Sequence, residues 1–445
     1  MFRPVVLLAS LLAFAAPASA VERLRVHGSN TIGETLAPAL AQAWLGTRGC
    51  GAVTRQDRAP GEFVLSGAAC GIEIEFATHG SSTGLKDLMA GATDIAMASR
   101  PVSPEEVERA GALGRLDMAP QEAVLALDGV AVIVHPDNPL RRVRVDQVRA
   151  LFDGSARDWS ALGGSGPVRV HARDEASGTW ETFRTLVLGE HTLRADATRY
   201  ESTAALARAV AADRNAIGFV GFAGIGPARA LAIADAGVAM APQPLRIAVE
   251  DYALSRRLYL YRPAQAGALA RAFVDFSLSA AGQRIVEQVG FVSQDIRAFG
   301  DAVREDAPDD YRALVRGAER LSLNFRFNRN GQLLDSKTER DVARLAEFMQ
   351  REANRDRRLL LLGFADPDET SAYLERALSN DRVDYIAGLL ERLGQPVHVL
   401  RGMGGSAPLA SDTGAQGRLR NRRVEVWVGP PGSARVDAAP LARTP

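Results

Sequence analysis

The sequence predicts a mixed α/β protein in which two α/β lobes precede a smaller α/β domain. From Val21 to about Ile296, short β-branched or apolar runs alternate with helical patterns, which is typical of parallel sheets covered by helices. The same rhythm starts again after Gly129 and gives a second set of elements. From Leu321 the order is strand, helix, strand, helix, strand, loop, strand. We therefore expect three folded units along the chain.

Composition excludes several classes of protein. The 445 residues carry 53 basic and 53 acidic side chains, so no overall charge attracts nucleic acid. Apolar residues make up 47% and charged residues 24%, which is ordinary for a globular chain. The only lysines are Lys86 and Lys337, and neither follows the glycine of a GxxxxGK[ST] phosphate-binding loop. A nucleotide-binding loop of that kind is excluded.

The first twenty residues predict an export signal. They contain one basic residue, a short apolar run and the small-residue ending Ala18-Ser19-Ala20. No cysteine follows this ending, so we expect no lipid anchor, and no later apolar run reaches about 18 residues. Export to an oxidising compartment predicts that Cys50 and Cys70 form a disulfide. The alternative, a metal site, lacks histidines at a ligand spacing, so we expect neither metal nor cofactor.

The elements of the first block follow from local patterns. In the first lobe we expect alternating strands and helices at Leu24–His27, Thr31–Leu45, Ile72–Thr78, Leu85–Ala90 and Asp94–Ala98. A long β-type run at Gly129–His135 then precedes an Asp-Asn-Pro turn and a helix at Val145–Phe152, and a second set of elements covers Pro167–Ile233.

The C-terminal block has clear helix and strand signals. Ser336-x-x-Glu339 is typical of a capping box, and an apolar stripe at helical spacing follows it. Leu359–Leu362 predicts a buried strand, and a second helix ends before Gly394 and Pro396. The strand Arg423–Val428 alternates, which predicts one face on a core. The expected divisions are a signal at 1–20, two lobes at 21–296, a linker with some helix at 297–318, the small domain at 319–429 and a frayed tail at 430–445.

Three Gly/Ser/Thr turns open helices in the first block. They are Gly28-Ser29-Asn30-Thr31, Gly80-Ser81-Ser82-Thr83-Gly84 and Ser177-Gly178-Thr179. The first turn of a helix leaves N–H groups unpaired, so each turn is a potential anion site at the carboxyl end of a strand. Arg173 lies four residues before Ser177 and would supply the main positive charge. The alternative is that each serine or threonine is only an N-cap.

Several ordered motifs of this block resemble the periplasmic phosphate-binding proteins of ABC transporters. They include VHGSNTIGETLAPALAQAWL, THGSSTGLKDLMAGATDIAMASRPVSPEE and RDEASGTWETF. The resemblance implies the two-lobed periplasmic binding protein fold, a dehydrated phosphate between the lobes and an ABC transporter permease as partner. It also implies that the cleft is lined by Ser29, Thr31, Ser81, Arg173, Ser177, Gly178 and Thr179, with Asn30 able to contribute at the first turn.

One position departs from that family. Where the family often has an aspartate that accepts a hydrogen bond from a protonated phosphate oxygen, this chain has Arg100. An arginine cannot accept a hydrogen bond, so a fully deprotonated or other multivalent oxyanion would be favoured. Two roles for Arg100 stay open, a ligand contact and a surface or lobe-bridging arginine.

The final block resembles the OmpA-like peptidoglycan-binding domain. The matching pieces include LSLNFRFNRNG, LLLLGFADPDE, ALSNDRVDYIAGLLERLG and RLRNRRVEVWV. The resemblance implies that Asp366 and Arg382 clamp the ammonium and carboxylate of diaminopimelate. The altered motif Gly363-Phe364-Ala365-Asp366, and Glu375 in place of an asparagine, leave two polar contacts open. We expect Arg422 and Arg423 to be one exposed strand residue and one local ion pair.

The resulting hypothesis is a non-enzymatic oxyanion receptor that is exported to the periplasm and bound to the cell wall or outer membrane. One alternative is a wall-binding protein whose first block is a degenerate or differently specific scaffold. A second is an enzyme with Ser29 or Ser177 as nucleophile, but neither lies in a GxSxG elbow beside a recognisable acid and histidine.

Overall fold

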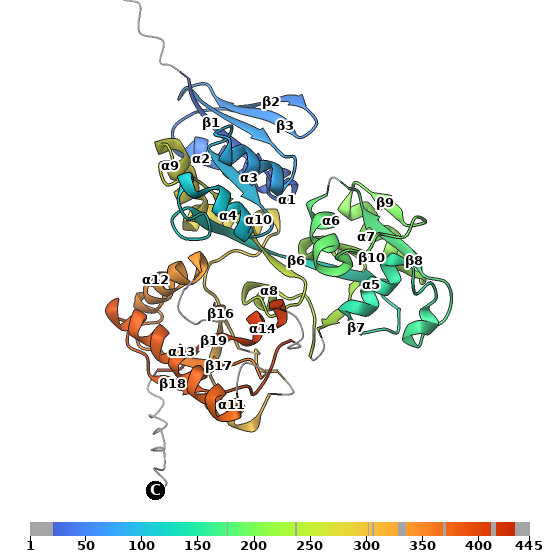
Figure 1. Cartoon of the computed structure of the whole chain (residues 1–445), viewed down its shortest axis with the longest axis vertical. Helices are drawn as coiled ribbons and strands as arrows, with labels where there is room; N and C mark the ends of the chain where they lie inside the picture. Colours follow the sequence, from blue (N-terminus) through green and yellow to red (C-terminus); the bar gives the residue numbers. More distant parts are fainter. Residues whose placement is uncertain are drawn as a thin grey trace, which may run out of the picture.

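Figure 1 shows a computed structural model of the chain, which describes residues 21–431 except 176, 236–237, 301, 305–306, 328–334, 368–370 and 411–414. The predicted export signal, and the predicted tail from residue 432, lie outside the described residues. Two lobes and a C-terminal domain are visible as the blue, green and orange parts of Figure 1. The predicted mixed α/β fold, with two lobes before a small α/β domain, is confirmed.

Lobe 1 (21–126 and 255–296) is built on the sheet β2-β3-β4-β1-β5-β14-β6. Strands β4, β1 and β5 are parallel neighbours. The other strands pair antiparallel, so the sheet is mixed. Its elements are β1 (Glu22–Gly28), α1 (Asn30–Gly33), α2 (Leu36–Thr47), β2 (Val53–Ala59), β3 (Glu62–Gly67), β4 (Ile72–Ala77), α3 (Ser81–Met89), β5 (Ile95–Ala98), α4 (Pro104–Arg109), η1 (Gly111–Leu113), β14 (Ser255–Tyr261), α9 (Ala268–Leu278) and α10 (Ala280–Val289).

The single helix predicted over Thr31–Leu45 is two helices, α1 and α2. The chain breaks between them at Glu34 and Thr35. Pro38 has no N–H for the Glu34 carbonyl, and its ring would clash with that carbonyl in a continuous helix. The break leaves α1 as a short turn directly after β1.

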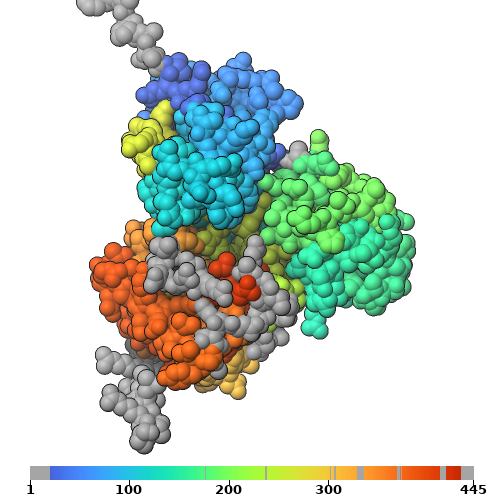
Figure 2. All heavy atoms as spheres, in the orientation of Figure 1, coloured from blue at the N-terminus to red at the C-terminus, as the bar shows by residue number. Residues whose placement is uncertain are grey.

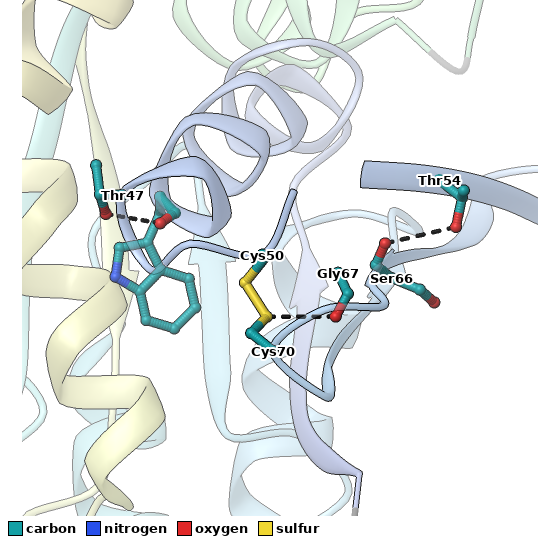
Figure 3. Close-up of a disulfide and its surroundings, with 7 residues drawn as sticks. Thr47, Cys50, Thr54, Ser66, Gly67 and Cys70 are labelled. Atoms are coloured by element: carbon teal, nitrogen blue, oxygen red, sulfur yellow. Dashed lines mark hydrogen bonds between the residues drawn. A yellow bond between two sulfur atoms is a disulfide. The ribbon is translucent and has the colours of Figure 1, made fainter. Parts of the chain in front are cut away.

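The predicted disulfide between Cys50 and Cys70 is present. It joins the segment after α2 to the turn between β3 and β4 (Figure 3). The two cysteines are 20 residues apart in the chain. Closing a loop of that length stabilises a fold by about 3 kcal/mol on the chain-entropy account.

Lobe 2 (127–254) continues the same sheet in the order β6-β10-β8-β9, and β11 also pairs with β6. A separate small sheet, β13-β12-β7, lies beside it. The elements are β6 (Glu122–Val134), β7 (Arg142–Arg144), α5 (Val145–Asp153), η2 (Trp159–Leu162), β8 (Arg169–Arg173), α6 (Gly178–Phe183), η3 (Arg184–Leu188), β9 (Thr198–Tyr200), α7 (Thr203–Ala212), β10 (Ala216–Gly221), η4 (Phe222–Gly224), β11 (Arg229–Ala230), β12 (Ala232–Ala234), β13 (Ala239–Met240) and α8 (Pro244–Ala248).

Strands β6 and β14 connect the lobes. β6 pairs with β14 along Glu122–Gly129 and with β10 along Val130–Val134, so one strand belongs to both lobes. All thirteen residues of β6 are buried, because helices or sheets cover both of its faces. In Figure 1 this pair of strands runs between the blue and green lobes.

The C-terminal domain has the sheet order β15-β16-β19-β17-β18 with α12 and α13 packed on it. The predicted order of strands and helices from Leu321 is confirmed, with one extra short helix before the last strand. The elements are β15 (Ala298–Phe299), α11 (Asp309–Leu314), β16 (Glu319–Arg326), α12 (Ser336–Gln350), β17 (Arg358–Phe364), α13 (Ala372–Arg392), β18 (Val399–Gly402), α14 (Ala415–Asn421) and β19 (Arg423–Gly429).

Residues 298–318, for which the sequence predicts a linker, contribute to this domain. β15 pairs with β16, and Tyr311 of α11 packs against Phe364 and Trp427. This segment covers the second face of the sheet, so both faces of β19 are buried. The alternation of β19 predicts only one buried face, because ion-paired Arg423 and Glu425 look like solvent-facing residues in sequence.

The N-cap of α12 differs from the prediction by one residue. Asp335 accepts a hydrogen bond from Thr338 N at 2.7 Å, whereas the hydroxyl of Ser336 donates to Glu122 in lobe 1. The capping-box pattern assigns the Ser336 hydroxyl to the N-terminus of the helix, but this hydroxyl instead forms a contact between the C-terminal domain and lobe 1.

Candidate functional site

The carboxyl ends of three parallel strands in lobe 1 bring together three serines, which we call the serine cluster. Ser29 follows β1, Ser81 follows β4, and Ser99 follows β5. The hydroxyl of Ser99 lies 3.2 Å from the hydroxyls of both Ser29 and Ser81. The backbone N–H of Ser99 donates to Ser81 Oγ at 3.1 Å. All three side chains are buried, so their hydrogen-bonding capacity is directed at one another and at the facing lobe.

Gly28 allows the first of these turns to form. Its φ is 131°, and a Cβ at this position would lie 2.1 Å from the carbonyl oxygen of Met97. No side chain fits there. The glycine lets the backbone pass close to β5, and Ser29 N then donates to Met97 O at 2.9 Å.

A carboxylate from lobe 2 faces the serine cluster. Glu181 of α6 accepts hydrogen bonds from Ser99 Oγ at 3.1 Å and from Ser81 Oγ at 3.4 Å. In this structure the hydroxyls of Ser81 and Ser99 therefore bind the carboxylate of Glu181. Sequence reasoning assigned no role to Glu181 or Ser99. The available signal for Glu181 was its position four residues after Ser177, one helical turn away.

A second contact between the lobes lies beside the first. Arg256 of β14 donates from Nη2 to Thr31 Oγ1 at 2.8 Å and to the Gly178 carbonyl at 3.0 Å. The same nitrogen forms an ion pair with Asp128 of β6 at 3.2 Å. Burial raises the pKa of Asp128, and Arg256 opposes that rise. Arg256 and Asp128 lie far from the glycine-serine turns in sequence, and no motif indicates them.

A cavity of about 260 Å³ opens between the lobes at this contact. The predicted residues Thr31, Gly178 and Thr179 line it, together with Glu34, Thr35, Asp128, Thr203, Gly221, Phe222, Ala223, Gly224, Val289, Gly290 and Phe291. We call it the inter-lobe cavity. Its polar lining comes from both lobes and from β6.

Arg173 and Ser177 lie on the lobe 2 side and differ in their bonding. Arg173 is 6% exposed and donates to the carbonyls of Tyr200 and Glu201 and to Thr203 Oγ1, at 3.2, 2.8 and 2.5 Å. Its guanidinium therefore holds the loop before α7. The hydroxyl of Ser177 is buried and has no hydrogen-bond partner among the described residues. A buried hydroxyl without a partner is costly, and a bound ligand would satisfy it.

Arg100 is engaged within lobe 1. Both of its Nη atoms donate to Glu106 at 2.8 Å, and Nη2 also donates to Ser82 Oγ at 2.9 Å. The guanidinium lowers the pKa of Glu106. Its hydrogen bonds thus hold Arg100 to Glu106 and Ser82 of lobe 1. Asn30 opens α1 with a half-buried side chain.

In the C-terminal domain, Asp366 and Arg382 lie at the same end of β17. Asp366 is fully buried and accepts a hydrogen bond from Asn421 Nδ2 at 3.0 Å. Arg382 of α13 donates to the carbonyl of Phe364 at 3.0 Å and lies over the ring of Phe327. Asn421 belongs to the quoted RLRNRRVEVWV motif, but sequence reasoning assigned it no contact.

Three neighbouring predictions have mixed outcomes. Arg423 forms the expected local ion pair with Glu425 at 2.8 Å and lies over the ring of Phe364. The expected exposed arginine is wrong, because Arg422 is 4% and Arg423 is 1% exposed. The segment before β16 covers this face of the sheet. Glu375 accepts a hydrogen bond from Gly405 N at 3.1 Å, so it holds a loop beside Asp366.

Comparison with known proteins identifies both parts of the chain. Residues 62–281 match the PBP superfamily domain, and residues 326–422 match the OmpA family. Protein SphX of Synechococcus elongatus is 31% identical over 248 residues, which cover 52% of this chain and 72% of that protein. The chain belongs to the PBP superfamily.

Two further proteins are similar to this PBP superfamily member. The phosphate-binding protein PstS of Pseudomonas aeruginosa is 28% identical over 262 residues, 53% of this chain and 78% of that protein. The solved structure of a possible phosphate binding protein from Planctomyces limnophilus shares the fold, with 24% identity, a TM-score of 0.51 and coverage of 62% of this chain and 94% of that one. The C-terminal domain is an OmpA family domain.

Two kinds of feature are absent from the described residues. No helix among them is long and apolar enough to cross a membrane. Within the same residues, no group of three or more His, Cys, Asp or Glu side chains is arranged to hold a metal ion.

Proposed function

We propose that this protein is a non-enzymatic periplasmic receptor for phosphate or a closely similar oxyanion, held at the cell wall by its OmpA family domain. The observation that carries the proposal is the contact of the serine cluster of lobe 1 with Glu181 of α6, the helix whose N-cap residue Ser177 has a buried hydroxyl without a partner among the described residues. The name of the phosphate-binding protein PstS, a relative of this chain, supports the choice of ligand. An ABC transporter permease would be the partner that receives the anion.

The chemistry of the site favours a protonated oxyanion. Ser29, Ser81 and Ser177 would donate to phosphate oxygens, whereas Glu181 can only accept while it is ionised. A phosphate that keeps one proton would donate that proton to Glu181. Sulfate has no proton to donate near neutral pH and would meet like charge there. Glu181 therefore supplies the acceptor that the Arg100 substitution removes, and the expectation of a fully deprotonated ligand no longer follows.

The wall-binding part of the proposal rests on the two residues of the OmpA family domain. Asp366 would accept the ammonium of diaminopimelate and Arg382 would bind its carboxylate, since both side chains lie at the carboxyl end of β17. Non-covalent binding of this kind would keep the receptor near the cell wall and outer membrane without a lipid.

A second candidate function has its own support. Glu181 already occupies the hydroxyls of the serine cluster, and three donors of Arg173 are used within lobe 2. Glu34 and Asp128 add carboxylates to the lining of the inter-lobe cavity, and Asp128 is paired with Arg256. These contacts suit a scaffold with a changed or lost ligand, so that wall binding would be the main activity.

Isothermal titration calorimetry with phosphate, arsenate and sulfate separates the two candidates. The receptor proposal predicts micromolar binding of phosphate and arsenate, which corresponds to about 8 kcal/mol, and much weaker binding of sulfate. Replacing Ser81 and Ser99 together by alanine would abolish that binding, and the melting temperature verifies that the variant is folded. Absence of binding by all three anions in the unmodified protein would favour the scaffold. Assays with phosphate esters are expected to show no turnover.

A further inference from the structure

Strand β14 connects the anion site to the OmpA family domain through two neighbouring arginines. Side chains alternate between the faces of a strand, so Arg256 and Arg257 point in opposite directions. Arg256 contacts Thr31 and Gly178 at the inter-lobe contact. Arg257 instead pairs with Glu250 and with Asp335, the N-cap residue of α12. The strand that links the lobes is therefore held from behind by the C-terminal domain.

The C-terminal domain also contacts lobe 1 beside this strand. Ser336 donates from its hydroxyl to Glu122 at 2.5 Å, and Glu122 also accepts from Tyr261 Oη at 2.9 Å. Burial raises the pKa of Glu122. About two turns further along α12, Arg344 donates to the side chain of Gln294 at 3.2 Å. In Figure 2 the orange atoms of the C-terminal domain lie directly against lobe 1.

Lobe 2 is contacted by a different part of the same domain. Leu409 is 3% exposed and packs within the hydrophobic core of lobe 2. Arg420 of α14 forms an ion pair with Asp235. Asn324 and Arg326 of β16 both donate to Asp251 Oδ1, at 3.0 and 2.9 Å. One rigid sheet domain is thus attached to lobe 1, to the connecting strand and to lobe 2.

We propose that the OmpA family domain is a brace that keeps the two lobes in contact and thereby sets the anion affinity of the receptor. A body fixed to both lobes restricts their separation. The lobes then stay in the arrangement in which Glu181 meets the serine cluster and Arg256 joins Thr31 to Gly178. A ligand that needs both lobes binds more tightly when that arrangement is already populated. The affinity part of this inference rests on the proposed function, whereas the effect on the lobes does not.

The ion pair between Asp235 and Arg420 offers a test in the full-length chain. Asp235→Arg places two positive charges together and would weaken the attachment of lobe 2, and the exchanged pair Asp235→Arg with Arg420→Asp would restore the contact. Leu409→Ser is a second way to weaken the contact between lobe 2 and the C-terminal domain if the charge variant folds poorly. Asp137→Arg is the matched control, because Asp137 forms an ion pair with Arg214 inside lobe 2, at 2.8 Å.

Two measurements report the outcome. Hydrogen exchange of the peptide that contains α6 would rise in Asp235→Arg and Leu409→Ser without ligand, because the lobe contact opens. Calorimetry would show phosphate affinity lowered by about threefold or more, as expected when the competent state is a smaller fraction of the population. The exchanged pair and Asp137→Arg would behave like the unmodified protein. Unchanged exchange in both loosened variants, or an effect that the exchanged pair does not reverse, would overturn the brace. If neither the unmodified protein nor any variant binds phosphate, phosphate is not the ligand. Hydrogen exchange of the peptide that contains α6 still tests whether the C-terminal domain holds the lobes together.

Discussion

Substitution of Gly178 by alanine tests the contact between the lobes most directly. A Cβ at Gly178 would lie 1.6 Å from Thr31 Oγ1, whereas ordinary contact begins at 3.4 Å, so the lobes would have to separate by about 1.8 Å. The hydrogen bond from Arg256 of lobe 1 to the Gly178 carbonyl of lobe 2, now 3.0 Å, would then break. Each hydrogen bond to a charged group contributes about 1.5–3 kcal/mol.

The loss of one such bond corresponds to about 1.5–3 kcal/mol, or about tenfold to a hundredfold in phosphate affinity. Calorimetry on the full-length chain measures this change, and the melting temperature verifies that both lobes are folded. Gly221→Ala is the matched control, because its Cβ would lie 3.8 Å from Thr179 Oγ1 in the same cavity. Phosphate affinity in Gly178→Ala equal to that of the control would refute the placement of the ligand between these residues.

Three further outcomes are expected. Glu181→Gln should weaken phosphate binding by about tenfold, because one charge-assisted hydrogen bond is lost, and should strengthen sulfate binding. Competition between the two anions measures both affinities. An unchanged ratio of these affinities would show that Glu181 does not select between them. Retention on purified cell-wall sacculi should fall in Asp366→Ala and should fall partly in Asn421→Ala, because Asn421 donates to Asp366. Asp356→Ala, at an exposed residue, is the control and should be retained normally. Equal retention of all three variants would contradict a peptidoglycan site at Asp366. The pKa of Asp335 is about 2 against an ordinary 3.8, because Arg257 offsets the effect of burial. Its stabilising contribution is therefore present above about pH 4 and is lost as the pH falls towards about 2. The loss in the free energy of unfolding should be about 1–2 kcal/mol, because the side chain is 34% exposed. Urea unfolding measures this loss, and a loss of the same size in Asp335→Asn would show that another group causes it.

Local sequence patterns predicted the elements that position the site. The turns at Ser29, Ser81 and Ser177 were found because a strand, a small hydroxyl residue and a helical pattern follow one another directly in the chain. Pairing of Cys50 and Cys70 followed from the compartment and from the lack of other cysteines. These inferences need only neighbouring residues or composition, so one sequence was enough for them.

Partners that lie far apart in sequence were not predictable in the same way. Arg256 reaches Thr31 across 225 positions, and Arg326 reaches Asp251 across 75. Arg173 was expected at the ligand, but a loop that starts at Tyr200 offers its carbonyls and takes up the guanidinium. An arginine donates to whichever acceptors the fold brings near, and its residue type does not say which ones they are.

The sequence by itself determined the main strands and helices that position the site, the three hydroxyl-bearing turns and the two families. Tertiary structure alone decided that Glu181 meets the serine cluster, that Arg100 pairs with Glu106, and that the segment predicted as a linker completes the C-terminal sheet. The physical reason is that helix and strand patterns depend on nearest neighbours along the chain. Which charged groups become partners depends instead on how the lobes and the OmpA family domain pack, and burial then requires each of those groups to be satisfied.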